Sequence, residues 1–144
     1  MTYRFCVSLH ARPGGVAAGE LVELRGARYP TLAVDPASLG RMLPVSFETS
    51  AAALEKLPRM LLEGDGSLVW VSPPQSPRWQ VDGLLHDGGR GLLWAELNGT
   101  CPRDCFDQLL TALGWPATPL IFQLVLAGVF LDEATFRRYA AAAK

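Results

Sequence analysis

The stretch "RWQVDGLLHDGGRGLLWAELN", residues 78–98, decides the fold class of this chain. Its two halves alternate apolar and polar residues, which is the pattern of half-buried strands. Between them, Asp87-Gly88-Gly89 supplies the positive φ values that a tight hairpin turn requires. The preceding "SLVWVS", residues 67–72, also has the composition of a strand. The sequence therefore predicts a three-stranded antiparallel meander over about residues 67–98.

The residues before the meander predict short strands followed by a helix. A helical turn is expected over 35–43, because Asp35 can cap it and Pro36 suits the first helical position. Pro58 ends or kinks the helix that follows. The expected elements are strands over 2–9, 20–26 and 29–34, and a helix over 49–57 capped by Thr49 or Ser50.

The stretch between Pro58 and the meander allows two interpretations. The helix can continue to Leu62, with a strand beginning at Ser67, and we favour this interpretation. Alternatively, Gly64-Asp65-Gly66 is the turn of a hairpin.

The residues after the meander predict more helix. Phe106, Leu109, Leu110 and Leu113 form one apolar face of a helix over 102–113. Residues 118–126 are either a buried strand or a short helix, and residues 131–143 are expected to be helical. The sum is an α+β fold, an antiparallel sheet with helices packed on one face.

The composition bounds the class of protein. With 144 residues, 49% hydrophobic and 19% charged, the chain is expected to form a single α+β domain over residues 1–144. The net charge of -1 and the scattered basic residues argue against nucleic acid as a partner. The longest apolar run, residues 119–131, is too short for a membrane span. Three cysteines and no visible signal peptide favour the cytoplasm, and the richness in Arg and Ala is typical of a GC-rich bacterial genome.

The motif "NGTCPRDC", residues 98–105, places two cysteines four residues apart. A thiol at a helix N-terminus can be reactive, which makes Cys101 and Cys105 weak candidates for a redox site. The spacing is not the C-x-x-C of thiol oxidoreductases, and it opposes an easy disulfide. The favoured interpretation is a helix start, with Thr100 or Cys101 as N-cap and Pro102 as the first helical residue.

No other motif points to catalysis, a cofactor or a metal. The two histidines, His10 and His86, are far apart in the sequence and have no metal-ligand spacing. The glycines of residues 11–20 do not match a phosphate-binding motif. We therefore expect no cofactor and no metal.

One face of the meander is a candidate contact surface. Alternation places Leu84 and Trp94 among polar residues on this face, and a mixture of that kind suits a ligand groove or a partner surface. The alternative is that the loop 73–78 or the N-terminal strands cover it. The candidate residues are Asp82, Leu84, Leu92, Trp94 and Glu96.

These observations favour a non-enzymatic cytoplasmic domain that binds another protein or its own copy as a homodimer. One alternative is a thiol redox protein or small enzyme that uses Cys101 and Cys105. Another is a domain that binds a small molecule in a cleft between the meander and the last two helices.

Overall fold

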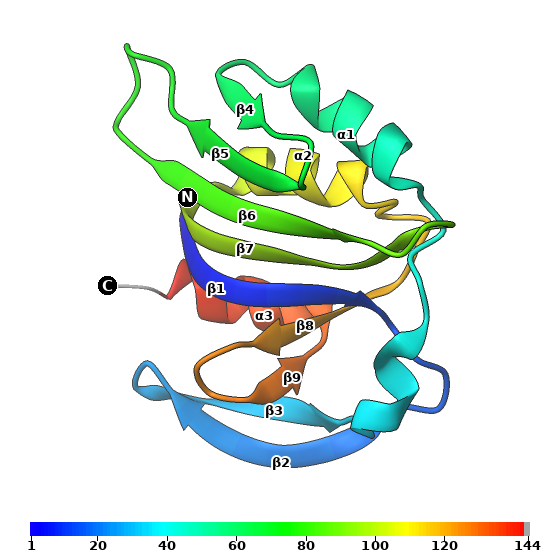
Figure 1. Ribbon diagram of the computed structural model, residues 1–144. Coiled ribbons are helices and arrows are strands. Elements are labelled where there is room, and N and C mark those ends of the chain that lie inside the picture. Colours follow the sequence, from blue (N-terminus) through cyan, green and yellow to red (C-terminus); the bar gives the residue numbers. More distant parts are fainter. Residues whose placement is uncertain (143–144) are drawn as a thin grey trace.

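A computed structural model describes residues 1–142, which form one curved antiparallel sheet with helices behind it (Figure 1). Nine strands in this part of the chain follow the order β2-β3-β9-β8-β1-β7-β6-β5-β4. Their bounds are β1 Thr2–Ala11, β2 Ala17–Leu24, β3 Ala27–Ala33, β4 Met60–Leu62, β5 Ser67–Val71, β6 Gln80–Asp87, β7 Leu92–Pro102, β8 Leu120–Leu124 and β9 Val129–Leu131. The first strand therefore lies in the middle of the sheet, between β7 and β8.

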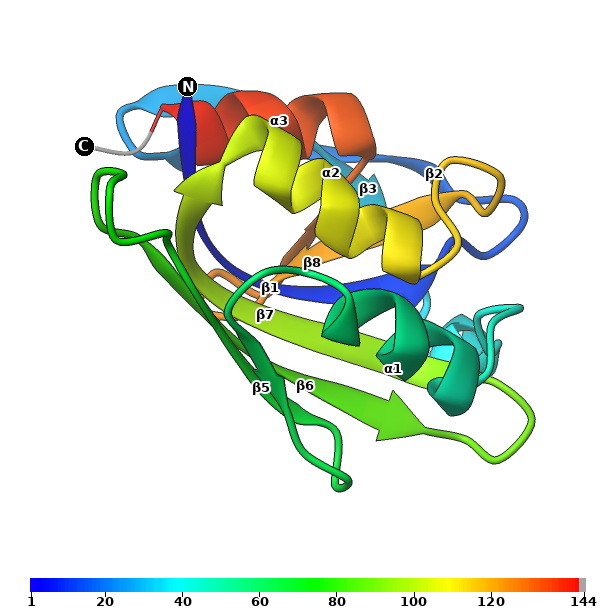
Figure 2. The same cartoon turned by 90° about the horizontal axis from the view of Figure 1, so that it is seen from above.

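The three α-helices of the described residues share one side of this sheet. They are α1 (Phe47–Glu55), α2 (Arg103–Ala112) and α3 (Glu133–Ala141), and a short 3-10 helix spans Pro36–Gly40. Seen from above, β1 and β7 curve around α2 and α3 (Figure 2). No helix of residues 1–142 has both the length and the apolar character that a membrane crossing needs.

Local capping residues explain where two of the helices begin. The side chain of Ser46 accepts a hydrogen bond from the Thr49 amide at the start of α1, and Asp132 accepts one from Thr135 at the start of α3. Each cap satisfies a backbone donor that has no partner within the helix.

The core lies between the helices and the sheet and is rich in aromatic rings. Phe106 of α2 packs edge-on against Tyr3 and Phe5 of β1. Phe136 of α3 stacks on Phe122 of β8, with 4.7 Å between ring centroids. Strands from both ends of the chain therefore contribute to one aromatic cluster.

The predicted fold class is confirmed: the sheet is antiparallel, it contains the β5-β6-β7 meander, and helices cover one face. The predicted helices at 49–57, 102–113 and 131–143 correspond to α1, α2 and α3, although residue 143 lies outside the described residues. Residues 118–126, for which the sequence allowed strand or helix, contain strand β8.

Two local predictions are wrong. The helix does not continue to Leu62, because it ends at Glu55 and residues 60–62 form β4, which pairs with β5 through the turn at 64–66. The cap of α1 is Ser46, three residues before Thr49. The residues after the helix explain the first difference: Pro58 cannot continue a helix, and Arg59 has φ of 65°, a left-handed conformation that turns the chain towards β4.

Candidate functional site

The face of the sheet opposite the helices carries ordered rows of side chains. Because paired residues of neighbouring strands share a face, the register places Gln123, Ser8, Glu96 and Leu84 in one row across β8, β1, β7 and β6. The next row towards the start of β1 contains Cys6, Asn98 and Asp82, and the row beyond it contains Arg4 and Thr100. We call this surface, the side of β8, β1, β7 and β6 that lies opposite the helices, the uncovered face.

Trp94 lies between both histidines of the chain on this face. The His86 ring stacks on its indole with 4.0 Å between centroids, and the His10 ring lies on its other side at 6.1 Å. His86 Nε2 is 2.9 Å from a carboxylate oxygen of Glu96. His10 Nε2 is 2.9 Å from the amide oxygen of Gln123. Polar side chains therefore hold the rings on both sides of the partly buried tryptophan.

Burial on this face is uneven. His10 is only 7% exposed and Ile121, its cross-strand partner, is fully buried. Burial lowers the pKa of His10, and the hydrogen bond that its Nε2 donates to the amide oxygen of Gln123 offsets part of this effect. The neutral imidazole is therefore the form that this environment favours.

A hollow of about 300 Å³ lies on the uncovered face, along the two rows that contain Glu96 and Asp82. Its lining combines apolar side chains, Leu84 and Val125, with the carboxylates of Asp82 and Glu96. Arginine and lysine are absent from the lining residues. The hollow therefore combines apolar side chains with two carboxylates, and its lining includes Asp82, Leu84 and Glu96 of the predicted contact surface.

The structure brings together four of the five residues predicted for this face. Asp82 is exposed, and Leu84, Trp94 and Glu96 are partly exposed. Leu92 is fully buried in the core, which corrects its predicted position.

A bulge explains the position of Leu92. The pairing of β6 with β7 shifts between His86 and Asp87, which interrupts the alternation of side chains before Leu92. The segment 43–45 then pairs with Leu92 through two backbone hydrogen bonds, beyond the place where β1 leaves β7.

The two candidate cysteines lie at the end of β7 and in the first turn of α2. Cys101 pairs with Tyr3 and is fully buried, and Cys105 is partly exposed. Burial raises the pKa of both thiols, and Asp104 adds to the effect for Cys105. The N-cap of α2 is Pro102, one residue later than predicted, and it makes no side-chain hydrogen bond. Both thiols are free and are held in the neutral form at neutral pH.

A metal or an internal ligand has little support in the described residues. Residues 1–142 contain no group of three or more His, Cys, Asp and Glu side chains that could hold a metal ion. The cavity between the meander and α2 holds about 10 Å³ and is lined by Leu54, Leu109 and other apolar side chains. Packed side chains therefore occupy this space, and the hollows suited to a ligand lie on the surface.

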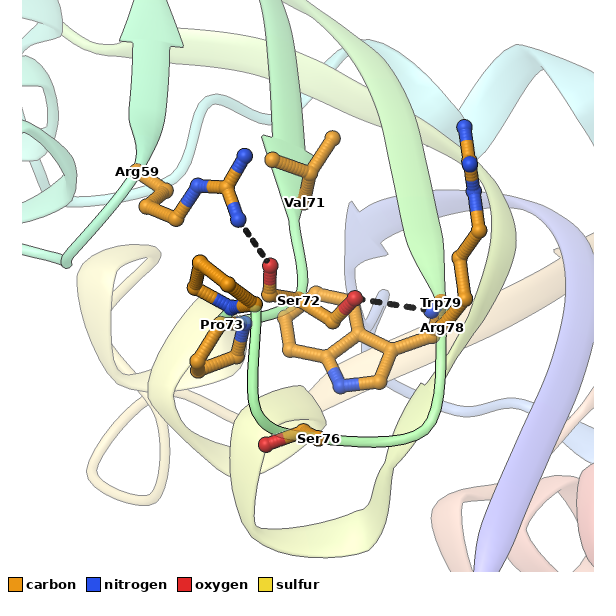
Figure 3. A pocket seen from close by; sticks show the side chains of 8 residues that line it. Arg59, Val71, Ser72, Pro73, Ser76, Arg78 and Trp79 are labelled. Carbon is orange, nitrogen blue, oxygen red and sulfur yellow. Dashed lines mark hydrogen bonds between the residues drawn. The ribbon is translucent and has the colours of Figure 1, made fainter.

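A second hollow, of about 260 Å³, lies against the loop between β5 and β6 (Figure 3). Arg59 and Arg78 contribute to its lining, and Trp79 lies beneath the loop. Sequence patterns gave no signal for this place, because Arg59 comes from the connection before β4 and no motif links it to Arg78.

Comparison with known proteins adds no assignment: the chain matches no protein-family model, no curated protein and no solved structure.

Proposed function

We propose that this chain is a non-enzymatic interaction domain that associates with a second copy of itself through the uncovered face. One observation carries the proposal: Trp94, the aromatic centre of a sheet face without a helix, remains partly exposed beside an apolar hollow. Tryptophan is enriched at the energetic centres of protein interfaces, where one ring removes a large apolar area from water.

The charges on this face favour a second copy as the partner. Arg4 is exposed on β1, whereas the carboxylates of Asp82 and Glu96 lie nearer to Trp94. A two-fold axis through the face sets the basic end of one copy against the acidic part of the other. This is the self-complementary arrangement that a symmetric dimer needs.

The surroundings of Cys101 and Cys105 favour a binding role over thiol chemistry at these two residues. Cys101 and Cys105, the two candidate cysteines, have raised pKa values, and both histidines lie on the opposite face of the sheet from Cys101. A thiol nucleophile needs a base within hydrogen-bond reach, and this arrangement separates the two groups by the thickness of the sheet.

A charge-swap experiment tests the proposal on residues that are exposed and make little contribution to folding. We expect sedimentation equilibrium to show a dimer, with Arg4→Glu and Asp82→Arg each weakening it and the double variant restoring it. Arg90→Glu, in the exposed turn after β6, is the matched control and leaves the dimer unchanged. Trp94→Ala abolishes association, because it removes the apolar centre.

A chain that is monomeric at every concentration overturns the proposal. So does a dimer that is insensitive to the charge changes and to Trp94→Ala. A thermal unfolding measurement on each variant separates lost association from lost folding.

A further inference from the structure

The second hollow, next to the β5–β6 loop, has the features of a site for a small anion. Arg59 and Arg78 both line it, and its other lining residues are uncharged (Figure 3). Neither guanidinium forms an ion pair with a carboxylate among residues 1–142. Arg137, by contrast, forms ion pairs with the carboxylates of Asp107 and Glu133. Two positive charges therefore share one hollow without an internal counter-charge.

Arg59 is held in place by the backbone around it. Pro58 directly precedes Arg59, and its carbonyl accepts a 2.8 Å hydrogen bond from the indole nitrogen of Trp70. Arg59 itself has a φ of 65°, and its Nη1 donates to the carbonyl of Ser72 at 2.7 Å. A guanidinium has five N–H donors, and this bond uses one of them. The remaining donors stay available at a fixed position.

The floor and walls of the hollow are equally ordered. The amide of Trp79 donates to the hydroxyl oxygen of Ser72 at 3.1 Å, and its ring packs edge-on against Trp70. Pro73 and Pro74 form part of the wall, and their rings restrict the backbone of the loop. Arg59 and the wall around Ser72 and Trp79 are therefore in place before any ligand arrives, which lowers the entropic cost of binding on this side of the hollow.

We propose that this hollow binds a small molecule through an oxyanion, a phosphate or carboxylate group, held between Arg59 and Arg78. Arginine is suited to this task because its planar group matches both oxyanions with paired hydrogen bonds. The hydroxyls of Ser72 and Ser76 line the same hollow and add donors. At about 260 Å³, the hollow has room for the oxyanion and a few further atoms. This site is separate from the uncovered face, and it does not depend on self-association.

The test is a titration of the full chain with inorganic phosphate and, in a second arm, with acetate, at constant ionic strength. Chemical shifts of the Trp79 and Ser72 amides and of the Arg side chains report binding. We expect saturable shifts confined to these groups in at least one arm, and the arm with the tighter binding identifies the oxyanion.

Variants decide whether the two arginines hold the anion. Arg78→Gln is the main variant, because Arg78 is exposed and makes no side-chain hydrogen bond within residues 1–142. We expect it and Arg59→Gln each to weaken binding about tenfold or more, since each removes a charge-assisted hydrogen bond. Arg90→Gln, outside the hollow, is the control and keeps wild-type affinity. Shifts that never saturate in either arm, or affinity that is unchanged in Arg78→Gln, overturn the proposal.

Discussion

At the scale of single residues, His10 lies in surroundings that are unusual for a histidine. It lies on a sheet face that no helix covers, yet it is buried among Trp94, Phe130 and Gln123. Its Nδ1 is buried and has no hydrogen-bond partner within residues 1–142. A proton on this ring therefore adds a charge in a buried place, on a ring whose Nδ1 has no hydrogen-bond partner within residues 1–142.

This burial predicts an acid-sensitive stability. The unfolded chain protonates His10 near its ordinary pKa of about 6.5, whereas the folded protein lowers that pKa. Below about pH 6.5 the unfolded state binds more protons at His10 than the folded state does. The free energy of unfolding therefore keeps its highest value above that pH and decreases as the pH drops towards the lowered pKa of the folded state.

Urea unfolding between about pH 7 and about pH 5, a window set by this pKa, measures the effect. His10→Phe keeps a ring of similar shape and cannot be protonated, so we expect its stability to change less over this range. If the wild type and this variant lose stability in parallel, another group causes the effect.

At the scale of elements, a glycine near the end of β7 permits the close approach of two strands. Gly99 has φ of 139°, and a Cβ placed on it would lie 2.1 Å from the carbonyl oxygen of Gln80 on β6. A side chain at this position therefore suffers both a steric clash and an unfavourable backbone conformation.

We expect Gly99→Ala to lower the free energy of unfolding by about 3 kcal/mol or more. Gly64→Ala is the matched control, because nothing lies within 4 Å of an added Cβ there. Its change should stay within about 0.5 kcal/mol. Chemical denaturation of the two variants checks both values, and equal effects would contradict this explanation.

The elements also show how far sequence patterns reach. The meander and the three helices could be predicted, because alternation, a 3.6-residue period and turn residues are local signals. Strand β4 belongs to the hairpin that the sequence allowed only as its second interpretation, because the left-handed Arg59 that starts the turn towards β4 is a residue type without that preference. Leu92 was assigned to the wrong face, because the bulge after His86 and the covering segment 43–45 come from tertiary pairing.

In the candidate site, too, local sequence signals predicted some residues, and only tertiary pairing revealed the others. Trp94 and its acidic neighbours were found from alternation alone. His10 and Gln123 join them only because β1 and β8 become neighbours of β7 in the sheet. The presence of Arg59 and Arg78 in the lining of one hollow likewise depends on a connection between elements that no local pattern records.

At the scale of the whole molecule, the last third of the chain completes the sheet and its core. Strand β8 pairs with β1, and Phe122 and Phe136 pack together next to Phe106 of α2. The meander is therefore continuous with the C-terminal strands through one shared core.

This continuity predicts that the meander does not survive alone. A chain truncated after residue 118 retains every residue of β5, β6 and β7 but exposes the aromatic side chains that β8 and α3 cover. We expect it to lose the near-ultraviolet circular dichroism of the tryptophans and to unfold without a cooperative transition. A truncated chain that kept both properties would show that the N-terminal part folds by itself.

The central position of β1 has a consequence for synthesis on the ribosome. Val7 and Leu9 emerge early, but the strand that pairs with them on one side, β8, ends at Leu124. At about 5–20 residues per second, the interval lasts roughly 6 to 23 s. During this time the nascent chain presents an apolar strand without its partners, so its yield in a cell depends on the chaperones that bind such segments.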